Sequence, residues 1–236
     1  MTRLRKKKVG RPSTKATSQL QGNDRRREIT EGALALFAER SFASVTIKDI
    51  AGKLGINPAL IYYYFENKQD LFRASIEAAI FDAVAHYDSI RRLHDHPVGL
   101  IDAWLESNVK LSRTISNLVK VMLDHSGMPR HIPSVDRLVK RFYQEEYRIL
   151  SGAIGRGIEL GVFRPVDQRQ MGLFASVHLD GVMVAAKIRP DFDLVQAIED
   201  LRSILFSALG YDHEKSGRPA ATADLLETPT RRRSTR

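Results

Sequence analysis

The spacing of apolar residues is the feature that most limits how this chain can fold. Between residues 23 and 211 they recur three or four positions apart, as on one face of a helix. No segment there sustains the alternation of apolar and polar residues that is typical of a half-buried strand. The pattern predicts an all-α protein of about nine helices joined by short loops.

Capping residues predict where these helices begin and end. The first helix should follow Asn23 or Asp24, and a short one should run from Ile47 to Leu54 after Thr46. Asn57 with Pro58 opens the next helix, and Asn67 opens a long one. Later helices are expected from Pro97, around Leu118, and after Ser134, Asp167 and Asp193, the last ending at Gly210.

The net charge of +9 is concentrated at the N-terminus, where residues 1–28 carry +8. Residues 1–22 contain few apolar side chains and are expected to form a disordered basic arm, and residues 212–236 a disordered tail. The chain has no cysteine, which excludes disulfides. No run of about 18 apolar residues is present and no apolar stretch follows the basic start, so we expect a cytoplasmic protein without a membrane span.

The segment 47–66, IKDIAGKLGINPALIYYYFE, has the spacing of a helix-turn-helix unit. The second helix of such a unit crosses the first, so the fifth residue must be small and the ninth must tolerate positive φ. Ala51 and Gly55 occupy these positions. The inward-facing positions carry Ile50, Leu54, Ile56, Ile61 and Tyr64. An ordinary pair of core helices is the alternative, but the full set beside a basic arm favours DNA binding.

The predicted recognition helix lacks the arginine that commonly reads guanine. Its outward face consists of Asn57, Pro58, Ala59, Leu60, Tyr62 and Tyr63. Ala59 and Leu60 suit the thymine methyl group, and the two outward tyrosine hydroxyls suit phosphate oxygens. Asn57 suits either a base contact or a helix cap. Tyr64 and Phe65 are expected to pack inward.

Three basic residues are further candidates for contacts with DNA. Lys68 follows the Asn67 cap, where its ammonium and the free N–H groups of the helix start suit a phosphate. Lys48 lies on the first helix of the motif, with simple solvation as the alternative. Gly10-Arg11-Pro12 resembles the core of an AT-hook, whose arginine enters an A·T minor groove, and nonspecific phosphate attraction is the alternative for Arg11.

These residues resemble the TetR family of bacterial transcriptional regulators. The shared pattern, within residues 25–72, is Phe37, Thr46, Ile50-Ala51, Gly55-Ile56 and Tyr62-x-x-Phe65-x-x-Lys68-x-x-Leu71. Ser41 departs from it, because the family usually has glycine after the first helix. The resemblance implies that Pro58, Ala59, Leu60, Tyr62 and Tyr63 touch bases or backbone, and that Thr46 and Lys68 touch phosphates.

The resemblance also implies a homodimer, formed through helices near 168–188 and 194–209, on a pseudo-palindromic operator in double-stranded DNA. Residues 23–66 would be the DNA-binding domain, and residues 67–211 would bind a small-molecule effector and dimerise. Small residues compatible with close helix approach are Ala175, Ser176, Gly181, Ala185 and Ala186, with Leu201 and Leu205 adding bulk. Contact within one chain is the alternative for all of them.

Side chains that could line an effector pocket are Trp104, Met122, His125, Tyr143, Tyr147, Met171, His178 and Met183, each with core packing as the alternative. Trp104 and the methionines suit an apolar or aromatic ligand. We predict no metal site, because the closest histidine pair, His94 and His96, lacks a completing ligand set. No cofactor is predicted, and no catalytic set or phosphate-binding loop supports an enzyme.

The sequence therefore predicts a DNA-binding regulator, most simply a repressor released by its effector. The alternative from another class is an architectural, nucleoid-type protein that binds DNA through its tails without a cognate site. A third reading is an effector-binding protein or enzyme that has lost DNA binding.

Overall fold

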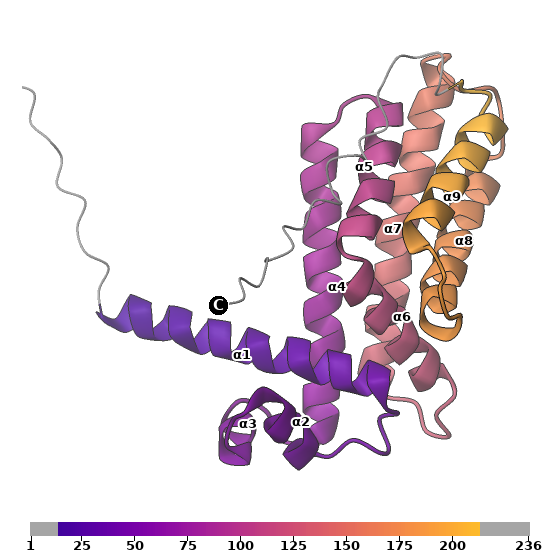
Figure 1. The fold of residues 1–236 in the computed structure, drawn as a ribbon. Coiled ribbons are helices and arrows are strands. Elements are labelled where there is room, and N and C mark those ends of the chain that lie inside the picture. Colours follow the sequence, from indigo (N-terminus) through magenta and orange to yellow (C-terminus); the bar gives the residue numbers. More distant parts are fainter. Residues whose placement is uncertain (1–13, 213–236) are drawn as a thin grey trace, which may run out of the picture.

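The computed structural model describes residues 14–212, with side chains from residue 22 onward. Within that range the chain forms helices and no strand, which confirms the all-α prediction. The helices are α1 (Thr14–Glu39), α2 (Ile47–Leu54), α3 (Pro58–Tyr64), α4 (Lys68–Leu93), α5 (Pro97–Lys110), α6 (Ser112–Ser126), α7 (Pro133–Glu159), α8 (Gln168–Ile188) and α9 (Leu194–Ala208). Figure 1 shows α2 and α3 beneath α1, at the foot of a body of long helices.

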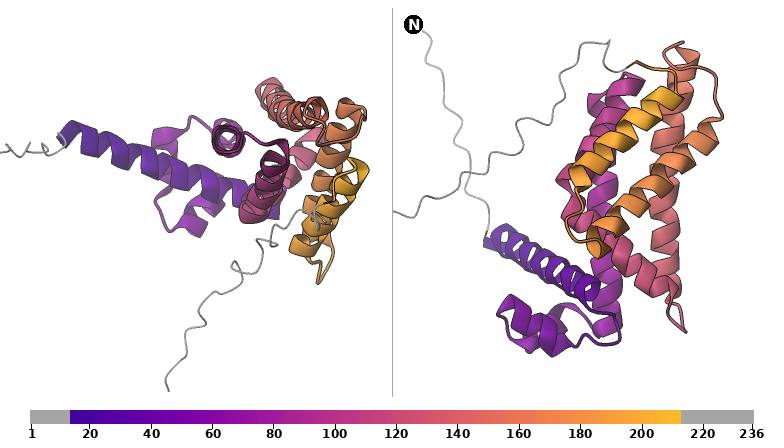
Figure 2. Two further views of the ribbon diagram at one scale, coloured as in Figure 1. Left: turned by 90° about the horizontal axis from the view of Figure 1, so that it is seen from above. Right: turned by 45° about the vertical axis from the view of Figure 1, so that its right-hand side comes forward.

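The head, which we define as α1 to α3, is joined to the body by aromatic packing. α1 crosses the lower part of α4, and its first half projects away from the body in all views (Figures 1 and 2). The ring of Phe72 on α4 meets Phe37 edge-on at 5.0 Å and lies 4.7 Å from Phe42 in the α1–α2 loop. All three rings lie against one continuous core, so the head is fixed to the base of α4.

The body, α4 to α9, is a bundle in which α7 packs on α4, α5 and α8, while α9 covers α5 and α8. Its interior contains Tyr87, Trp104, Phe142 and Phe206, all at most 2% exposed. The last helix ends as predicted, with Gly210 at a left-handed φ of 71°. The body is therefore built from long amphipathic helices whose apolar stripes meet in one interior.

Among the described helices, α8 is the one whose length and composition would allow it to cross a membrane. It packs against α6, α7 and α9 here, and it includes Asp180 and Lys187. Its exposed apolar side chains Leu173, Val177 and Ile188 follow a helical spacing along one stripe. α8 is thus a core helix of the bundle with one uncovered apolar face.

Two predicted helix starts are wrong. The first helix was expected to follow Asn23 or Asp24, but α1 begins at Thr14, because a helix that is already nucleated extends at one hydrogen bond per residue through good helix formers such as Ala16 and Gln19. α7 begins one residue before the predicted Ser134 cap, with Pro133 at its first position and no side-chain cap. Arg11 and the tail from residue 213 lie outside the described residues.

Candidate nucleic-acid interface

The turn between α2 and α3 has the geometry that the residue spacing predicted. Ala51 is 1% exposed where the helices cross, and Gly55 has a φ of 65°. Ile50 and Ile61 are fully buried, whereas Leu54, Ile56 and Tyr64 are partly buried against the same core. The N–H of Ile56 donates to the carbonyl of Ala51 and closes the end of α2.

Thr46 begins α2 through a reciprocal capping box with Asp49. The Thr46 hydroxyl accepts from the Asp49 N–H at 3.1 Å, and the Asp49 carboxylate accepts from the Thr46 N–H at 2.8 Å. The Thr46 hydroxyl also donates to the Asp49 carboxylate at 2.6 Å, and this bond, followed by the one from the Thr46 N–H, lowers the pKa of Asp49. The side chain of Thr46, predicted to touch phosphate, is therefore part of the cap, and it remains exposed at the start of the helix.

The outward face of α3 is polar and aromatic. Asn57 acts as the helix cap, because its Oδ1 accepts from the N–H of Ala59 at 2.9 Å, which leaves its amide N–H groups for another partner. Tyr62 and Tyr63 are 57% and 80% exposed. Asn57 and Ala59 are also exposed, and Pro58 and Leu60 are half-buried. All six predicted contact residues thus lie on the same short element.

The ammonium group of Lys68 makes hydrogen bonds within the chain. Its Nζ donates to the carbonyls of Phe42 and Val45 at 2.8 and 2.9 Å and lies 4.4 Å from the ring centroid of Phe42. Two of its three N–H groups therefore hold the α1–α2 loop, which leads directly to Thr46, against the start of α4. This role was missed because the carbonyls that Lys68 binds lie more than twenty residues earlier in the chain.

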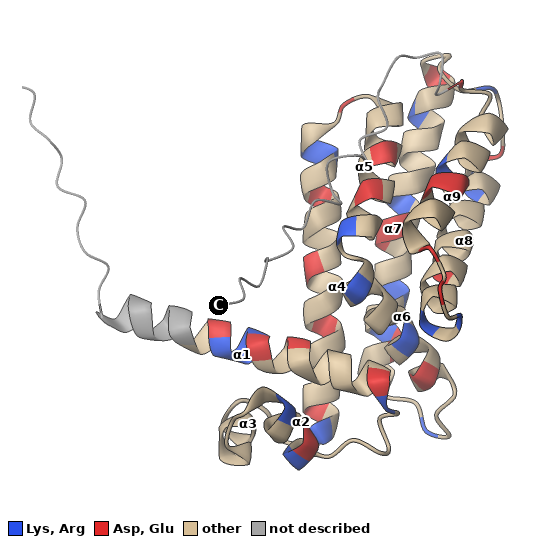
Figure 3. Cartoon of the chain, viewed as in Figure 1, with Lys and Arg blue, Asp and Glu red and all other residues tan. Residues whose placement is uncertain are grey.

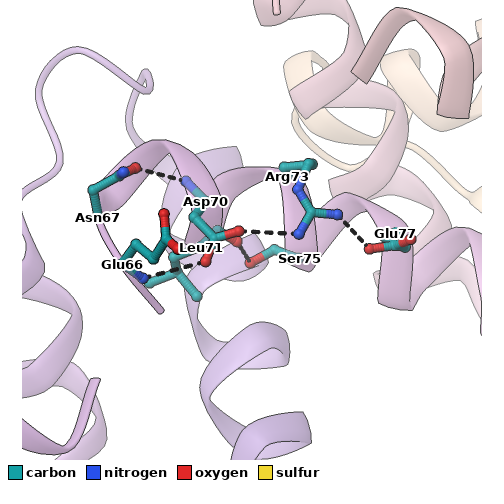
Figure 4. A network of polar contacts seen from close by, with 7 residues as sticks. All are labelled: Glu66, Asn67, Asp70, Leu71, Arg73, Ser75 and Glu77. Carbon is teal, nitrogen blue, oxygen red and sulfur yellow. Dashed lines mark hydrogen bonds and ion pairs between the residues drawn. The ribbon is translucent and has the colours of Figure 1, made fainter. Parts of the chain in front are cut away.

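The start of α4 is fixed by a polar network (Figure 4). Asn67 caps the helix by accepting from the N–H of Asp70 at 2.9 Å. The Asp70 carboxylate accepts from the N–H of Glu66 at 3.3 Å and from Arg73 at 3.0 Å, and Arg73 also pairs with Glu77. The network joins the end of the head to the long helix that enters the body.

The outward face of α3 carries no charged side chain, and the nearby basic residues lie on other helices. Figure 3 shows α3 free of Lys, Arg, Asp and Glu, as the sequence indicated. Lys48 is exposed on α2, and no ion pair or hydrogen bond involves its side chain among the described residues. Sequence reasoning missed Arg26, whose guanidinium lies 5.1 Å above the ring of Phe65 and connects α1 to the end of α3.

Ser41 does not disturb the turn after α1. The Ser44 N–H and hydroxyl both donate to the Ser41 carbonyl, at 3.1 and 3.0 Å. Among described residues other than glycine, positive φ occurs at Asp191 and not here. The loop therefore takes a form in which serine is unstrained where the family usually has glycine.

The proposed pocket residues lie in different parts of the body. Trp104 and Met183 are fully buried, and Met122 is 6% exposed. Tyr143 is half-buried and donates to Asp180, whereas Tyr147 accepts from Arg169 at the surface. Met171 and His178 are half-buried on α8, where His178 lies 5.7 Å from the ring of Phe174.

His125 lies elsewhere, in the last turn of α6 beside Phe72 of α4. Its ring is 6.3 Å from Phe72, which is about 22 Å from Tyr87 along α4 at the usual rise per residue. Its Nε2 donates to Asp136 at 2.9 Å, and this bond lowers the pKa of Asp136. With His131, these two side chains form the one group of three possible metal ligands found among the described residues, their ligand atoms within 4.8 Å of one another. The sequence predicted no metal site, and His94 and His96 were only its closest histidine pair.

Comparison with known proteins identifies this architecture. The sequence model of "Bacterial regulatory proteins, tetR family" matches residues 29–75, which contain α2, α3 and the network at the start of α4. Within these residues the chain carries the TetR-family sequence pattern. It is 26% identical over 145 residues to the transcriptional repressor KstR2 of Mycobacterium tuberculosis, covering 61% of this chain and 72% of that protein.

Two further likenesses agree. The biofilm operon negative regulator IcaR of Staphylococcus epidermidis is 34% identical over 50 residues, covering 21% of this chain and 27% of IcaR. The TetR-family regulator PfmR of Thermus thermophilus has the same fold, with a TM-score of 0.63 at 20% identity over 78% of this chain and 97% of PfmR. The chain is thus a DNA-binding transcriptional regulator of a family whose members dimerise, and the architectural alternative is not favoured.

Proposed function

We propose that this chain is a cytoplasmic TetR-family repressor that binds a pseudo-palindromic operator as a homodimer and is released by a small-molecule effector. The observation that carries the proposal is the exposed face of α3, where aromatic and polar side chains project from a rigidly capped helix. In this proposal α3 enters the major groove, Tyr62 and Tyr63 contact DNA, and Ala59 and Leu60 meet thymine methyl groups.

The proposed dimer forms through the uncovered apolar faces of α8 and α9. Leu173 and Val177 are each 60% exposed on α8, and Ile204 is 49% exposed on α9. The small residues Ala175 and Ala185 instead pack within the chain, as do Leu201 and Leu205. The larger, exposed side chains therefore supply the surface that a second copy would cover.

Two elements support a coupling between effector and operator. α4 runs from the network below the head into the body, and α6 packs on α1. A cleft of about 570 Å³ separates the α1–α2 loop at Phe42 from the α6–α7 turn at Met128 and Arg130. An effector that binds more tightly to another arrangement of α4 and α6 would shift the head. Operator affinity would then fall by the difference in the effector's binding free energy between the two arrangements.

Selection from random double-stranded DNA with the full chain tests operator binding. We expect an inverted repeat with half-site centres about 34–36 Å apart, and a loss of affinity of about tenfold or more for Tyr63→Ala. Phe81→Ala, which removes a 69% exposed ring from α4, outside the head, is the matched control and should bind normally. Equal retention of all sequences would support the architectural alternative instead.

Sedimentation of the full chain tests the dimer. Val177→Asp places a charge in the middle of the proposed interface and should give monomers at concentrations where the wild type is dimeric. Leu93→Asp makes the same change at a 77% exposed position at the end of α4 and should leave the dimer intact. A dimer that survives Val177→Asp would exclude this face as the interface.

A further inference from the structure

Two carboxylates lie on facing helices of the body, one of them buried (Glu146) and the other half-buried (Asp180). Glu146 of α7 is 3% exposed and accepts a hydrogen bond from the hydroxyl of Ser176 on α8. Asp180, one turn further along α8, accepts from the hydroxyl of Tyr143 on α7 at 2.7 Å. The two acids are close enough that the charge of Asp180 adds to burial in raising the pKa of Glu146 to about 7.

These acids have no cationic partner within the described residues, where neither forms an ion pair and no basic group affects the pKa of either. Another acid buried in the body, by contrast, has a cationic partner. Asp102 of α5 lies 3.3 Å from the guanidinium of Arg202 on α9, which also pairs with Glu199 at 2.5 Å. A buried carboxylate without a counter-charge is costly, so the acids on α7 and α8 are a specific departure from that pattern.

Tyr143 of α7 and Tyr87 of α4 lie beside the two acids, and Trp104 of α5 lies beside Tyr87. The hydroxyl of Tyr87 on α4 and the indole N–H of Trp104 on α5 are buried, and the side chains of Trp104 and Asn108 are the hydrogen-bonding neighbours of that hydroxyl. Burial, and then the charge of Glu146, raises the pKa of Tyr87, which places its hydroxyl beside the acids. Aromatic faces with adjacent carboxylates are the side chains that bind organic ammonium groups.

We propose that the effector is a small organic cation, an amine or quaternary ammonium compound, bound between α4, α5, α7 and α8 with Glu146 and Asp180 as its counter-ions. This inference rests on the proposed effector control and specifies its chemistry. It replaces the expectation of a purely apolar or aromatic ligand that Trp104 and the methionines suggested. Trp104, Tyr87 and Tyr143 supply the aromatic surface, and the two acids supply the charge that a neutral ligand could not neutralise.

The proposed site also predicts that cation binding changes the protonation of Glu146. A cation beside Glu146 favours its ionised form, so binding near pH 7 should release a proton and should strengthen as pH rises from 6 to 8. The other titratable groups that face Glu146 are Asp180 of α8, Tyr143 of α7 and Tyr87 of α4, and the tyrosines stay neutral in this range because burial raises the pKa of both. Glu146 is therefore the main source of the proton.

Titration calorimetry with the full chain tests the proposal. The probes are choline, benzyltrimethylammonium and tetraphenylphosphonium, with 3,3-dimethylbutan-1-ol as the neutral carbon analogue of choline. We expect at least one cation to bind with proton release, about tenfold or more tighter than any neutral probe. Glu146→Gln and Asp180→Asn should each weaken that cation by a further tenfold, whereas Glu145→Gln, which removes a charge paired with Arg148 on the outer side of α7, should not.

Failure of this inference and failure of the proposed function give different results. Failure of all three cations to bind, or equal binding of choline and its neutral analogue, would overturn the cation assignment even where the operator is bound specifically. Cation binding without any operator preference would leave the assignment intact and overturn the repressor. If Glu146→Gln unfolds, Tyr143→Phe removes the hydrogen bond to Asp180 while keeping the ring, and an unchanged affinity for the cation would also contradict the proposal.

Discussion

The head and the body of this molecule distribute polar groups in opposite ways. The buried side chains of α2 and α3 are all apolar, namely Ile47, Ile50, Ala51 and Ile61, and the residues proposed to read DNA project outward. The body buries Glu146 and leaves apolar side chains such as Val177 exposed. The head is therefore organised to hold an outer face rigidly, whereas the body buries an acidic side chain and leaves an apolar outer face uncovered.

The sharpest way to test this division is to remove packing from the head. Ile61→Ala deletes a fully buried side chain between α2 and α3, and we expect a loss of about 3–4 kcal/mol in the free energy of unfolding of the head. Operator binding should fall with it. Tyr63→Ala should lower operator binding without changing thermal stability, because that side chain is 80% exposed.

Calorimetry and operator titration of both variants distinguish the two effects. If Tyr63→Ala destabilises the fold as much as Ile61→Ala does, the outer face of α3 is part of the core and the division fails. If Ile61→Ala leaves stability unchanged, the head does not depend on the packing described above.

The next largest effect should come from the buried acid of the body. Because the folded pKa of Glu146 is raised to about 7, the wild type loses stability as pH rises from about 4.5 to 7 and remains at the lower value above that. Glu146→Gln stays neutral throughout. The variant should therefore be more stable by about 3 kcal/mol at pH 8, with the difference vanishing below about pH 4.5.

Denaturant unfolding at pH 4.5 and pH 8, without any cation, measures this difference. Glu145→Gln, next to it in sequence but half-buried and paired with Arg148, should follow the wild type at both values. A Glu146→Gln variant that is less stable than the wild type at pH 8 would mean that the ionised carboxylate stabilises the fold, against the arrangement described here.

The sequence predicted the head more completely than the body for a physical reason. The crossing of α2 and α3 depends on residues within one twenty-residue segment, so Ala51 and Gly55 could be assigned from spacing alone. The role of Lys68 depends on carbonyls in a distant loop, which spacing does not reveal. The burial of Glu146 was not predicted, because an acid on an amphipathic helix is usually solvated. The signal was present nonetheless, since Glu146 lies four residues from both Phe142 and Leu150 on the buried stripe.

A smaller effect should follow from Gly55, where the backbone of the head is specialised. A Cβ at this position would meet nothing within 4 Å, so Gly55→Ala introduces only the strain of a left-handed φ of 65°. We expect a loss of about 1–1.5 kcal/mol in stability and a modest loss of operator affinity, since the angle between α2 and α3 depends on this residue. Gly52→Ala, which also meets nothing within 4 Å but lies in helical backbone, should be neutral or stabilising in the same unfolding measurement.

The smallest effect, and the one that compares the two helix starts of the head, concerns Thr46. Thr46→Ala removes the cap of α2 and should cost about 1 kcal/mol in the free energy of unfolding, comparable to Asn57→Ala at the start of α3.

The stability contributions of the two caps should differ in pH dependence. The pKa of Asp49 is lowered by its bonds from Thr46, so the capping box is complete above the ordinary pKa of aspartate and is lost as pH falls below it, whereas the Asn57 cap has no titrating member. Unfolding of both variants should be measured at pH 3 and pH 7. We expect the cost of Thr46→Ala to shrink at low pH and that of Asn57→Ala to stay constant. A constant cost for both would mean that the Asp49 carboxylate contributes nothing to the start of α2.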